Sequence, residues 1–296
     1  MHDYIAHASG ADHQVRIFAA TTKDLVEQAR QYHHTLPVIT AALGRLLTAG
    51  ALMGSMMEGE DASLTLRINC SGPVKGMTVV AKTDGSVKGY AINPFVDLPL
   101  NAKGKLDVSG AIDLGVLSVV RDYGLKDPYV GETQIVSGEI AEDLAYFFAN
   151  SEQTNSSVAL GVLVDRDQSV KQAGGFILQL MPNTEERVIA KLEENIGALP
   201  PYTTMLEEGM TPEDIIRRVM EGLDTEFYDP IPAAFVCDCS EEKVEKVLLS
   251  ISRDDLKEIL DDGKPVEVAC EFCGSKYEIS HERLKSLCEA AGLQYS

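Results

Sequence analysis

The chain has 296 residues, 45% of them hydrophobic and 24% charged, which is the composition of an ordinary globular protein of about two domains. Its 46 acidic and 26 basic side chains leave a formal net charge of −20, and a field of that sign disfavours nucleic acid and membrane surfaces as partners. The opening stretch MHDYIAHASGADHQVRIF lacks the basic and apolar regions of a secretion signal. We therefore expect a cytosolic protein, in which thiols stay reduced and permanent disulfides are rare.

Near the N-terminus the sequence predicts a helix within residues 21–34 and a second, strongly apolar helix over residues 36–57. The second stretch is long enough to cross a bilayer. However, Arg45 lies near its centre, where membrane insertion would cost about 2.5–3.5 kcal/mol, and the surrounding Ala, Gly and Thr residues offer little to offset that cost. We interpret the stretch as a buried helix packed inside an α/β domain.

Strand patterns follow this helix. Apolar and polar residues alternate along 62–70, and two β-like runs flank Asp84-Gly85, a dipeptide typical of hairpin turns. Residues 139–153 repeat apolar residues at helical spacing. Further strands are predicted at 115–124, 133–138, 156–165 and 172–182. Together these patterns predict that residues 1–182 form one mixed α/β domain on a largely antiparallel sheet.

Residues 183–230 have a different character. They carry 12 acidic and 4 basic side chains, which leaves this segment with a net charge of −8. Two helices are predicted, the second with Thr211 as its N-cap and Pro212 in its first turn. Both have apolar stripes, formed by Val188, Ile189, Leu192 and Ile196 in the first and by Ile215, Ile216, Val219 and Met220 in the second. We interpret the segment as an acidic helical linker that rests on a neighbour, and leave open whether it can detach.

Residues 231–296 form a small tail. Short helices are predicted after Ser240 and Ser252, then a strand, a cysteine-containing turn and a second strand, and a last helix that starts near Ser280. The tail has few large apolar residues and would be only marginally stable without a cross-link or a metal. The predicted fold is thus α+β, with an N-terminal mixed α/β domain, a helical linker and a small C-terminal domain.

Five of the six cysteines lie in this tail, and four of them form the pairs Cys237-X-Cys239 and Cys270-X-X-Cys273 on either side of the stretch 240–269. Four thiolates are the usual ligand set of a tetrahedral structural zinc site, and soft thiolates select zinc among the common cytosolic metals. The second pair is followed by Gly274, which allows the backbone to turn so that both sulfurs point inward. We therefore predict that the reduced protein binds one zinc ion through these four cysteines.

Two competing interpretations of the cysteine pairs are weaker. A thioredoxin-type site needs a helix that begins at the Cys-X-X-Cys motif, whereas the β-like stretch 274–279 follows here. Permanent disulfides conflict with the expected reducing compartment. The two remaining cysteines, Cys70 and Cys288, are interpreted as small hydrophobic core residues, with a minor redox role left open for Cys288.

Two roles remain open for the metal. Most four-thiolate zinc sites only fold a domain. In this chain, however, each cysteine pair is close enough to oxidise internally, which would eject the metal. Its apparent binding free energy, about 10–16 kcal/mol in small zinc units, would then be lost and the tail would unfold. A linker that leans on the tail would expose its apolar helix faces.

Motifs for conventional catalysis or for ATP use are missing from the sequence. It contains no GxxxxGK[ST], GxGxxG, GxSxG or HExxH pattern, and its adjacent histidines, His33 and His34, are expected on the polar surface. We therefore expect a protein that is not an enzyme.

Five stretches carry a resemblance to a known family. They are FVCDCS and CEFCGSKYEI in the tail, DPYVG and YFFANSEQ in the first domain, and GGFILQLMP before the linker. By these stretches the chain resembles the 33-kDa heat-shock chaperones, redox-regulated holdases of the bacterial cytosol. The resemblance extends over nearly the whole chain, and all four cysteines and both spacings are present.

The resemblance implies a zinc-bound, inactive reduced state. On oxidation it implies disulfides Cys237–Cys239 and Cys270–Cys273, release of zinc, and unfolding of the linker with the tail. The active form would be a homodimer that holds unfolding client proteins without ATP during oxidative stress. Residues 1–182 would then carry client-binding and dimerisation surfaces, and residues 231–296 would be the redox switch. We expect client contacts on apolar faces of the linker and the first domain.

Two alternatives stay beside the chaperone. One is a binding module for protein or nucleic acid whose zinc is purely structural, and the net charge already disfavours nucleic acid. The other is a thiol-disulfide oxidoreductase, which the missing helix after Cys273 disfavours.

Overall fold

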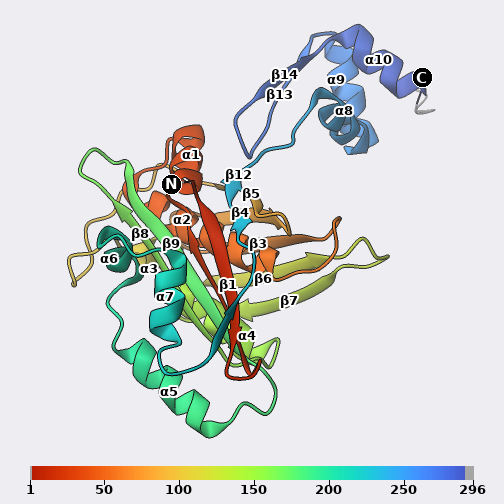
Figure 1. The fold of residues 1–296 in the computed structure, drawn as a ribbon. Helices are drawn as coiled ribbons and strands as arrows, with labels where there is room; N and C mark the ends of the chain where they lie inside the picture. Colours follow the sequence, from red (N-terminus) through yellow and green to blue (C-terminus); the bar gives the residue numbers. More distant parts are fainter. Residues whose placement is uncertain (1, 291–296) are drawn as a thin grey trace. The chain divides into compact units, whose positions relative to one another are not determined.

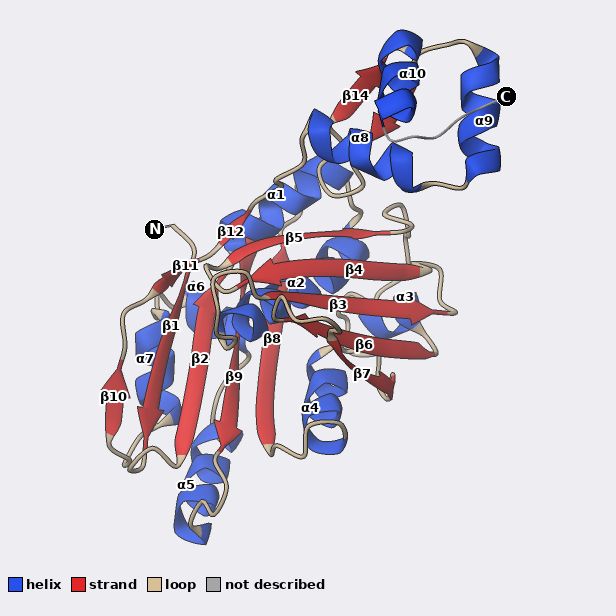
Figure 2. Cartoon of the chain, turned by 90° about the vertical axis from the view of Figure 1, so that its right-hand side faces the viewer, coloured by secondary structure: helices blue, strands red, loops and turns tan. Residues whose placement is uncertain are grey.

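The apolar stretch near the N-terminus folds as one long helix, α2 (Pro37–Ser55), which contacts strands of both large sheets (Figure 2). The computed structural model describes residues 2–290, apart from the side chain of Arg253. By length and composition α2 could cross a membrane, but 89% of its apolar window is buried inside the protein. The prediction of a buried core helix is confirmed, because the strands around α2 cover almost all of its side chains.

The chain divides into two compact units, Met1–Val236 and Cys237–Ser296 (Figure 1). Residues 183–230, which the sequence predicts as a linker, belong to the first unit by their contacts, and so do residues 231–236. An apolar cluster lies in each unit. Each unit therefore has a core of its own.

The strands of the first unit are divided between two sheets, and every strand pair except β12 with β5 is antiparallel among the described residues. The first sheet, in the order β10-β1-β2-β9-β8 with β11 also paired to β1, contains β1 (Tyr4–Gly10), β2 (Val15–Thr21), β8 (Ser156–Val164), β9 (Val170–Leu180), β10 (Thr225–Phe227) and β11 (Ile231–Pro232). The second, in the order β12-β5-β4-β3-β6-β7, contains β3 (Ser63–Cys70), β4 (Gly76–Lys82), β5 (Ser86–Ala91), β6 (Gly115–Asp122), β7 (Tyr129–Gln134) and β12 (Ala234–Phe235). The predicted mixed α/β fold with largely antiparallel pairing is confirmed, although the strands form two sheets and not one, and β10 to β12 come from beyond residue 182.

Local sequence explains several of these elements. Burial alternates along β3 and β5, as the sequence pattern predicts. Gly85 has a φ of +80° in the turn that joins β4 to β5, a conformation that glycine adopts without strain. The first unit also contains the helices α1 (Lys23–His33), α3 (Val108–Ile112), α4 (Ala141–Asn150), α5 (Glu186–Gly197), α6 (Tyr202–Glu207) and α7 (Pro212–Val219).

The strand predicted at residues 133–138 is misplaced. The strand at this point is β7, which ends at Gln134. The buried carboxylate of Asp143 accepts hydrogen bonds from the backbone N–H groups of Val136 and Ser137 at 2.8 Å and of Ile140 at 2.9 Å. These residues therefore wrap around the start of α4 instead of pairing in a sheet. Strands β1 and β2 and the short strands β10 to β12 were not predicted.

The second unit follows its prediction closely. It contains α8 (Glu241–Ser250), α9 (Arg253–Asp262), the hairpin of β13 (Val266–Ala269) and β14 (Lys276–Ile279), and α10 (His281–Ala290). The hydroxyls of Ser240 and Ser252 accept hydrogen bonds from the first turns of α8 and α9, as predicted for N-caps.

Candidate metal centre

Four cysteine side chains meet in the second unit. Cys237 and Cys239 lie in the extended stretch before α8, and Cys270 and Cys273 lie in the turn that joins β13 to β14. In that turn, Gly274 has a φ of +71° and donates its N–H to the Cys270 carbonyl at 2.8 Å. The two cysteine motifs that meet thus come from two local structures. One motif lies in a hairpin turn, and the other lies just before the capped helix α8.

The distances within this cluster match a metal site. All four sulfur atoms lie within 4.8 Å of one another. Cys237 Sγ lies 3.7 Å from Cys270 Sγ, and Cys239 Sγ lies 3.4 Å from Cys273 Sγ. Four sulfurs that are each about 2.3 Å from a tetrahedral zinc ion are about 3.8 Å apart. Because all six cysteines are free thiols, the cluster can offer four sulfur ligands to one ion.

The pKa values of Cys237, Cys270 and Cys273 are shifted in different directions. Burial raises the pKa of Cys237 and, likewise, that of Cys270. Burial also acts to raise the pKa of Cys273, but hydrogen bonds with Ser275 and with neighbouring sulfurs outweigh it and lower this pKa to about 7. Four thiolates at such distances repel one another unless a cation lies among them. The donor set therefore suits a soft divalent cation.

Two hydroxyl groups adjoin the sulfurs. Tyr277 Oη donates to Cys239 Sγ at 3.0 Å, and Ser275 Oγ lies 3.2 Å from Cys273 Sγ. The pKa of Tyr277 is raised to about 12, mainly by its hydrogen bond to Cys239 and then by burial. Outer hydrogen bonds of this kind orient metal ligands and tune their reactivity. Neither hydroxyl was predicted from the sequence. The alternation of side-chain direction along the strand after Cys273 could, however, have indicated the hydroxyl of Tyr277.

The second unit has only a small apolar cluster among its described residues. The cluster consists of Val244, Leu248, Leu256, Ile279, Leu284 and Cys288, with partly buried residues around them. Cys288 is 1% exposed, so its interpretation as a core residue is confirmed. Cys70 lies half-buried at the end of β3 in the first unit, where burial raises the pKa of its thiol. A cluster this small leaves the four cysteines as the main potential cross-link of the unit.

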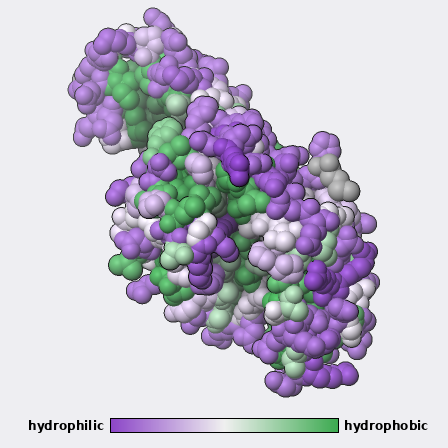
Figure 3. All heavy atoms as spheres, turned by 90° about the vertical axis from the view of Figure 1, so that its left-hand side faces the viewer, coloured by the Kyte–Doolittle hydropathy of each residue, from purple (hydrophilic) through white to green (hydrophobic). Residues whose placement is uncertain are grey.

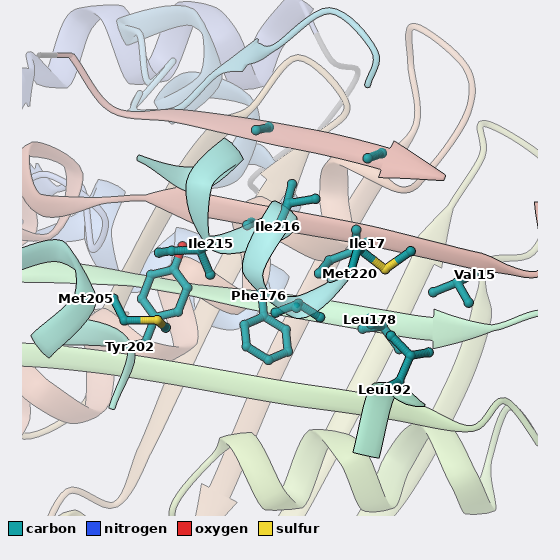
Figure 4. Packing of buried hydrophobic residues seen from close by; sticks show 14 of the residues in the cluster. Val15, Ile17, Phe176, Leu178, Leu192, Tyr202, Met205, Ile215, Ile216 and Met220 are labelled. Carbon is teal, nitrogen blue, oxygen red and sulfur yellow. The ribbon is translucent and has the colours of Figure 1, made fainter. Parts of the chain in front are cut away.

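The predicted linker is docked on the first sheet by apolar packing. Alternate residues of β2 and β9 face helices α5 to α7, and Figure 4 shows Ile215, Ile216 and Met220 above these strands. The buried linker side chains in this apolar cluster are Val188, Leu192, Tyr202, Met205, Leu206, Ile215, Ile216, Val219 and Met220. Thr211 and Asp214 form an N-terminal capping box at α7, and Thr211 is the predicted N-cap. The linker therefore has the neighbour that its apolar stripes require.

Close backbone approach and polar contacts fix this docking. A Cβ atom at Gly10 would lie 2.3 Å from Met220 Cε and 2.5 Å from the Asp224 carbonyl oxygen, so only glycine fits there without a shift. Tyr202 Oη donates to the Ala20 carbonyl at 3.0 Å. The sheet and the linker thus fit closely together at this interface.

Comparison with known proteins agrees with these features. The family model described as Hsp33 protein matches residues 3–280. The 33 kDa chaperonin of Lachnoclostridium phytofermentans is 56% identical over 287 residues, which cover 97% of this chain and 98% of that protein. The 33 kDa chaperonin of Agathobacter rectalis is 54% identical, over 97% of this chain and 100% of that protein.

A solved structure extends the similarity to the fold. The crystal structure of the 33 kDa chaperonin from Thermotoga maritima, a heat shock protein 33 homologue, superposes with a TM-score of 0.88 at 37% sequence identity. The superposition covers 99% of this chain and 100% of that chain. The likeness therefore includes both units.

Proposed function

The chain belongs to the Hsp33 family and is a chaperone, not an enzyme; from this premise we propose that it is a redox-regulated, ATP-independent holdase. In the reduced state it would be inactive and bind one zinc ion. Under oxidative stress it would bind unfolding proteins and prevent their irreversible aggregation. The observation that carries the proposal is the cluster of four free thiols in a unit with a small apolar core.

Cys237, Cys239, Cys270 and Cys273 are the proposed zinc ligands. A bound zinc ion would supply a tetrahedral cross-link among four thiolates and would do no chemistry on a substrate. The chain's own groups then hold the ligands in place, through the turn at Gly274 and the hydroxyl of Tyr277. Zinc, not another metal, is proposed because four thiolates form a soft donor set.

Oxidation would convert the ligands into two disulfides. One molecule of peroxide takes two electrons from two thiolates and two protons from the solvent, which yields one disulfide and two waters. The nearest sulfurs in the cluster belong to different motifs. We nevertheless propose the pairs Cys237–Cys239 and Cys270–Cys273, which the resemblance to the family implies and which the short loops between the partners favour once the unit loses its cross-link.

Loss of the ligands would unfold residues 231–296, and on warming the linker, residues 183–230, would lose its docking on the first sheet. The faces exposed by linker release are apolar on both sides, the sheet and the helices, which suits unfolding clients. Hydrophobic patches also reach the surface elsewhere (Figure 3). Among the exposed large hydrophobic residues, Phe95, Leu114 and Leu125 are 66%, 72% and 74% exposed. We place client binding and homodimer formation on residues 1–182, and the protein in the cytosol, without nucleic acid or membrane partners.

A peroxide titration at raised temperature tests the proposal. Released zinc, remaining thiols and suppression of client aggregation are followed in the same samples of the full chain. We expect zinc to leave as the four thiols disappear, and suppression to rise with it. If all four thiols are oxidised and aggregation of the client is unchanged, the metal site is purely structural and the holdase proposal is wrong.

Two single variants provide the matched control. Cys273→Ser removes one proposed ligand, whereas Cys70→Ser removes a thiol outside the cluster. We expect the Cys70 variant to bind zinc and respond to peroxide like the parent. The Cys273 variant should bind zinc much more weakly and lose the peroxide-dependent gain in suppression.

A further inference from the structure

The last segment of the first unit is a strand bound at a sheet edge. Strand β12 pairs in parallel with β5, with Ala234 opposite Ser86 and Phe235 opposite Val87. The N–H of Ala234 donates to the Gly85 carbonyl at 3.2 Å, and the N–H of Val236 donates to the Val87 carbonyl at 2.8 Å. Helix α1 contacts the same strand. We call the backbone edge at residues 85–87, together with Tyr32 of α1, the β12 site.

Side chains of the bound segment alternate between buried and exposed. Ala233 and Phe235 are 6% and 5% exposed, whereas Ala234 is exposed and Val236 is 43% exposed. The ring of Phe235 packs edge-on against Tyr32, with centroids 5.4 Å apart and an interplanar angle of 61°. The β12 site therefore binds backbone through two carbonyls and selects an apolar side chain at every second position.

The attachment of β12 is weak compared with that of the linker helices. Two backbone hydrogen bonds and one large buried side chain hold β12 on β5, whereas a broad apolar cluster holds the linker on its sheet. Only Val236 separates Phe235 from Cys237 in the chain. Unfolding that starts at the cysteines would therefore reach β12 before any other strand of the first unit.

We propose that the β12 site, once β12 has left it, binds an extended segment of an unfolding client protein. The client segment would run parallel to β5 and place an aromatic or large aliphatic side chain where Phe235 now lies. The inference rests on the proposed holdase function. It assigns one client-binding place on the chain, the β12 site, and one kind of client segment that binds there.

Three observations favour this occupant. The chain's own segment occupies the site in that manner, so the geometry for an extended peptide is already present. An unpaired strand edge readily accepts another strand. Unfolding chains expose extended, apolar segments, and the net charge of −20 disfavours strongly acidic ones.

Site-specific photo-crosslinking tests the inference. The photoreactive residue p-benzoylphenylalanine replaces either Tyr32, at the β12 site, or Tyr146 on α4, as the control. These tyrosines are matched in exposure, at 42% and 40%, and both lie on helices of the first unit. The full chain is activated with peroxide and heat and then illuminated with a thermally unfolding client protein.

We expect at least five times more client adduct at position 32 than at position 146 after activation, and little at either position in the reduced chain. Equal yields at the two positions would overturn the inference. So would an adduct at position 32 that contains only a second copy of the chain. Suppression of aggregation is measured in the same samples. If suppression occurs with equal crosslinking, only the inference fails; if no suppression occurs, the holdase function fails and the inference with it.

A peptide provides a second measurement without any change in the protein. The probe is a fluorescent peptide with the sequence of residues 230–236, PIPAAFV, and its control carries Phe235→Ala. The activated chain should bind the probe at least tenfold more tightly than the control peptide. Equal affinity for the two peptides would contradict recognition of the aromatic side chain.

Discussion

The linker and the four-cysteine unit are held in place by different forces. Residues 183–230 are docked by large apolar side chains on a preformed sheet, and each fully buried one contributes about 1.5–3 kcal/mol. Residues 237–290 have a small apolar cluster and four sulfurs that can share one ion. An oxidant attacks thiols and leaves hydrocarbon packing unchanged. Oxidation alone should therefore open the second unit, whereas the linker should need heat as well.

Among the changes that test this difference between the linker and the four-cysteine unit, removal of the metal should have the largest effect on folding. We expect that a strong chelator applied to the reduced, zinc-loaded chain unfolds residues 237–290, because apparent binding of structural zinc is worth about 10–16 kcal/mol. Hydrogen exchange measures the result, as loss of amide protection in α8 to α10 with protection in α7 retained at low temperature. Full protection of α8 to α10 in metal-free protein would show that apolar packing suffices there.

Truncation of a buried linker residue tests the other half of the comparison, the docking of the linker by apolar packing. Ile216 is 0% exposed in the apolar cluster, so Ile216→Ala should destabilise the docked linker by about 2–5 kcal/mol. Amide hydrogen exchange in residues 183–230 should then become faster in the reduced, zinc-bound chain. Arg218→Ala, on the exposed side of the same helix, is the control and should change little. Equal exchange in both variants would contradict docking by burial.

The pH dependence of the first unit should follow Asp3. Burial raises the pKa of this carboxyl to about 6 from its ordinary value of 3.8, although it accepts a hydrogen bond from the N–H of Leu25 at 2.8 Å. Between pH 4 and 6 the folded state therefore holds a proton that the unfolded state has released, and stability falls as the pH rises through this range. The loss is on the order of 2–3 kcal/mol.

Asp3→Asn should remove this loss. Urea unfolding of the first unit should show the variant to be more stable than the parent at pH 7, with the difference disappearing near pH 4. The exposed Asp61→Asn serves as control. A parent whose stability does not fall between pH 4 and 6 would contradict the assignment.

The smallest expected effect concerns the hydroxyl of Tyr277. Tyr277→Phe removes the hydrogen bond to Cys239 Sγ and should speed peroxide oxidation of the reduced cluster about fivefold. Rates of thiol loss measured by stopped alkylation check this, with the exposed Tyr123→Phe as control. Identical rates in the two variants would leave the hydroxyl with no role in the response to oxidants.

Sequence patterns predicted most of the elements that lie between clear turn and cap signals. The buried helix α2, the hairpin at Gly85 and the capped helices after Ser240 and Ser252 all have strong local signals. Strands β1 and β2 were missed because they carry small and polar residues. Their place in the sheet depends on the pairing of β2 with β9, a strand that lies far from both in the chain.

The candidate site was predictable in part. Spacing alone identified the cysteines that converge, because close pairs on a hairpin turn and before a helix need few long-range contacts. The partners of the site depend on three-dimensional pairing and were not predicted. Tyr277 donates its hydroxyl to Cys239 in the other motif, and β12 pairs with β5 although much of the first unit lies between them in the chain. Neither contact leaves a periodic pattern in the sequence.

Hydrogen exchange during stepwise activation tests the central claim most directly. The zinc-loaded chain is treated with peroxide at low temperature and then warmed, and protection is followed in residues 183–230 and 237–290 of the same samples. We predict that residues 237–290 lose protection with the thiols in the cold, that residues 183–230 lose it only on warming, and that client binding follows the second step. Loss of linker protection in the cold, together with the thiols, would contradict the account.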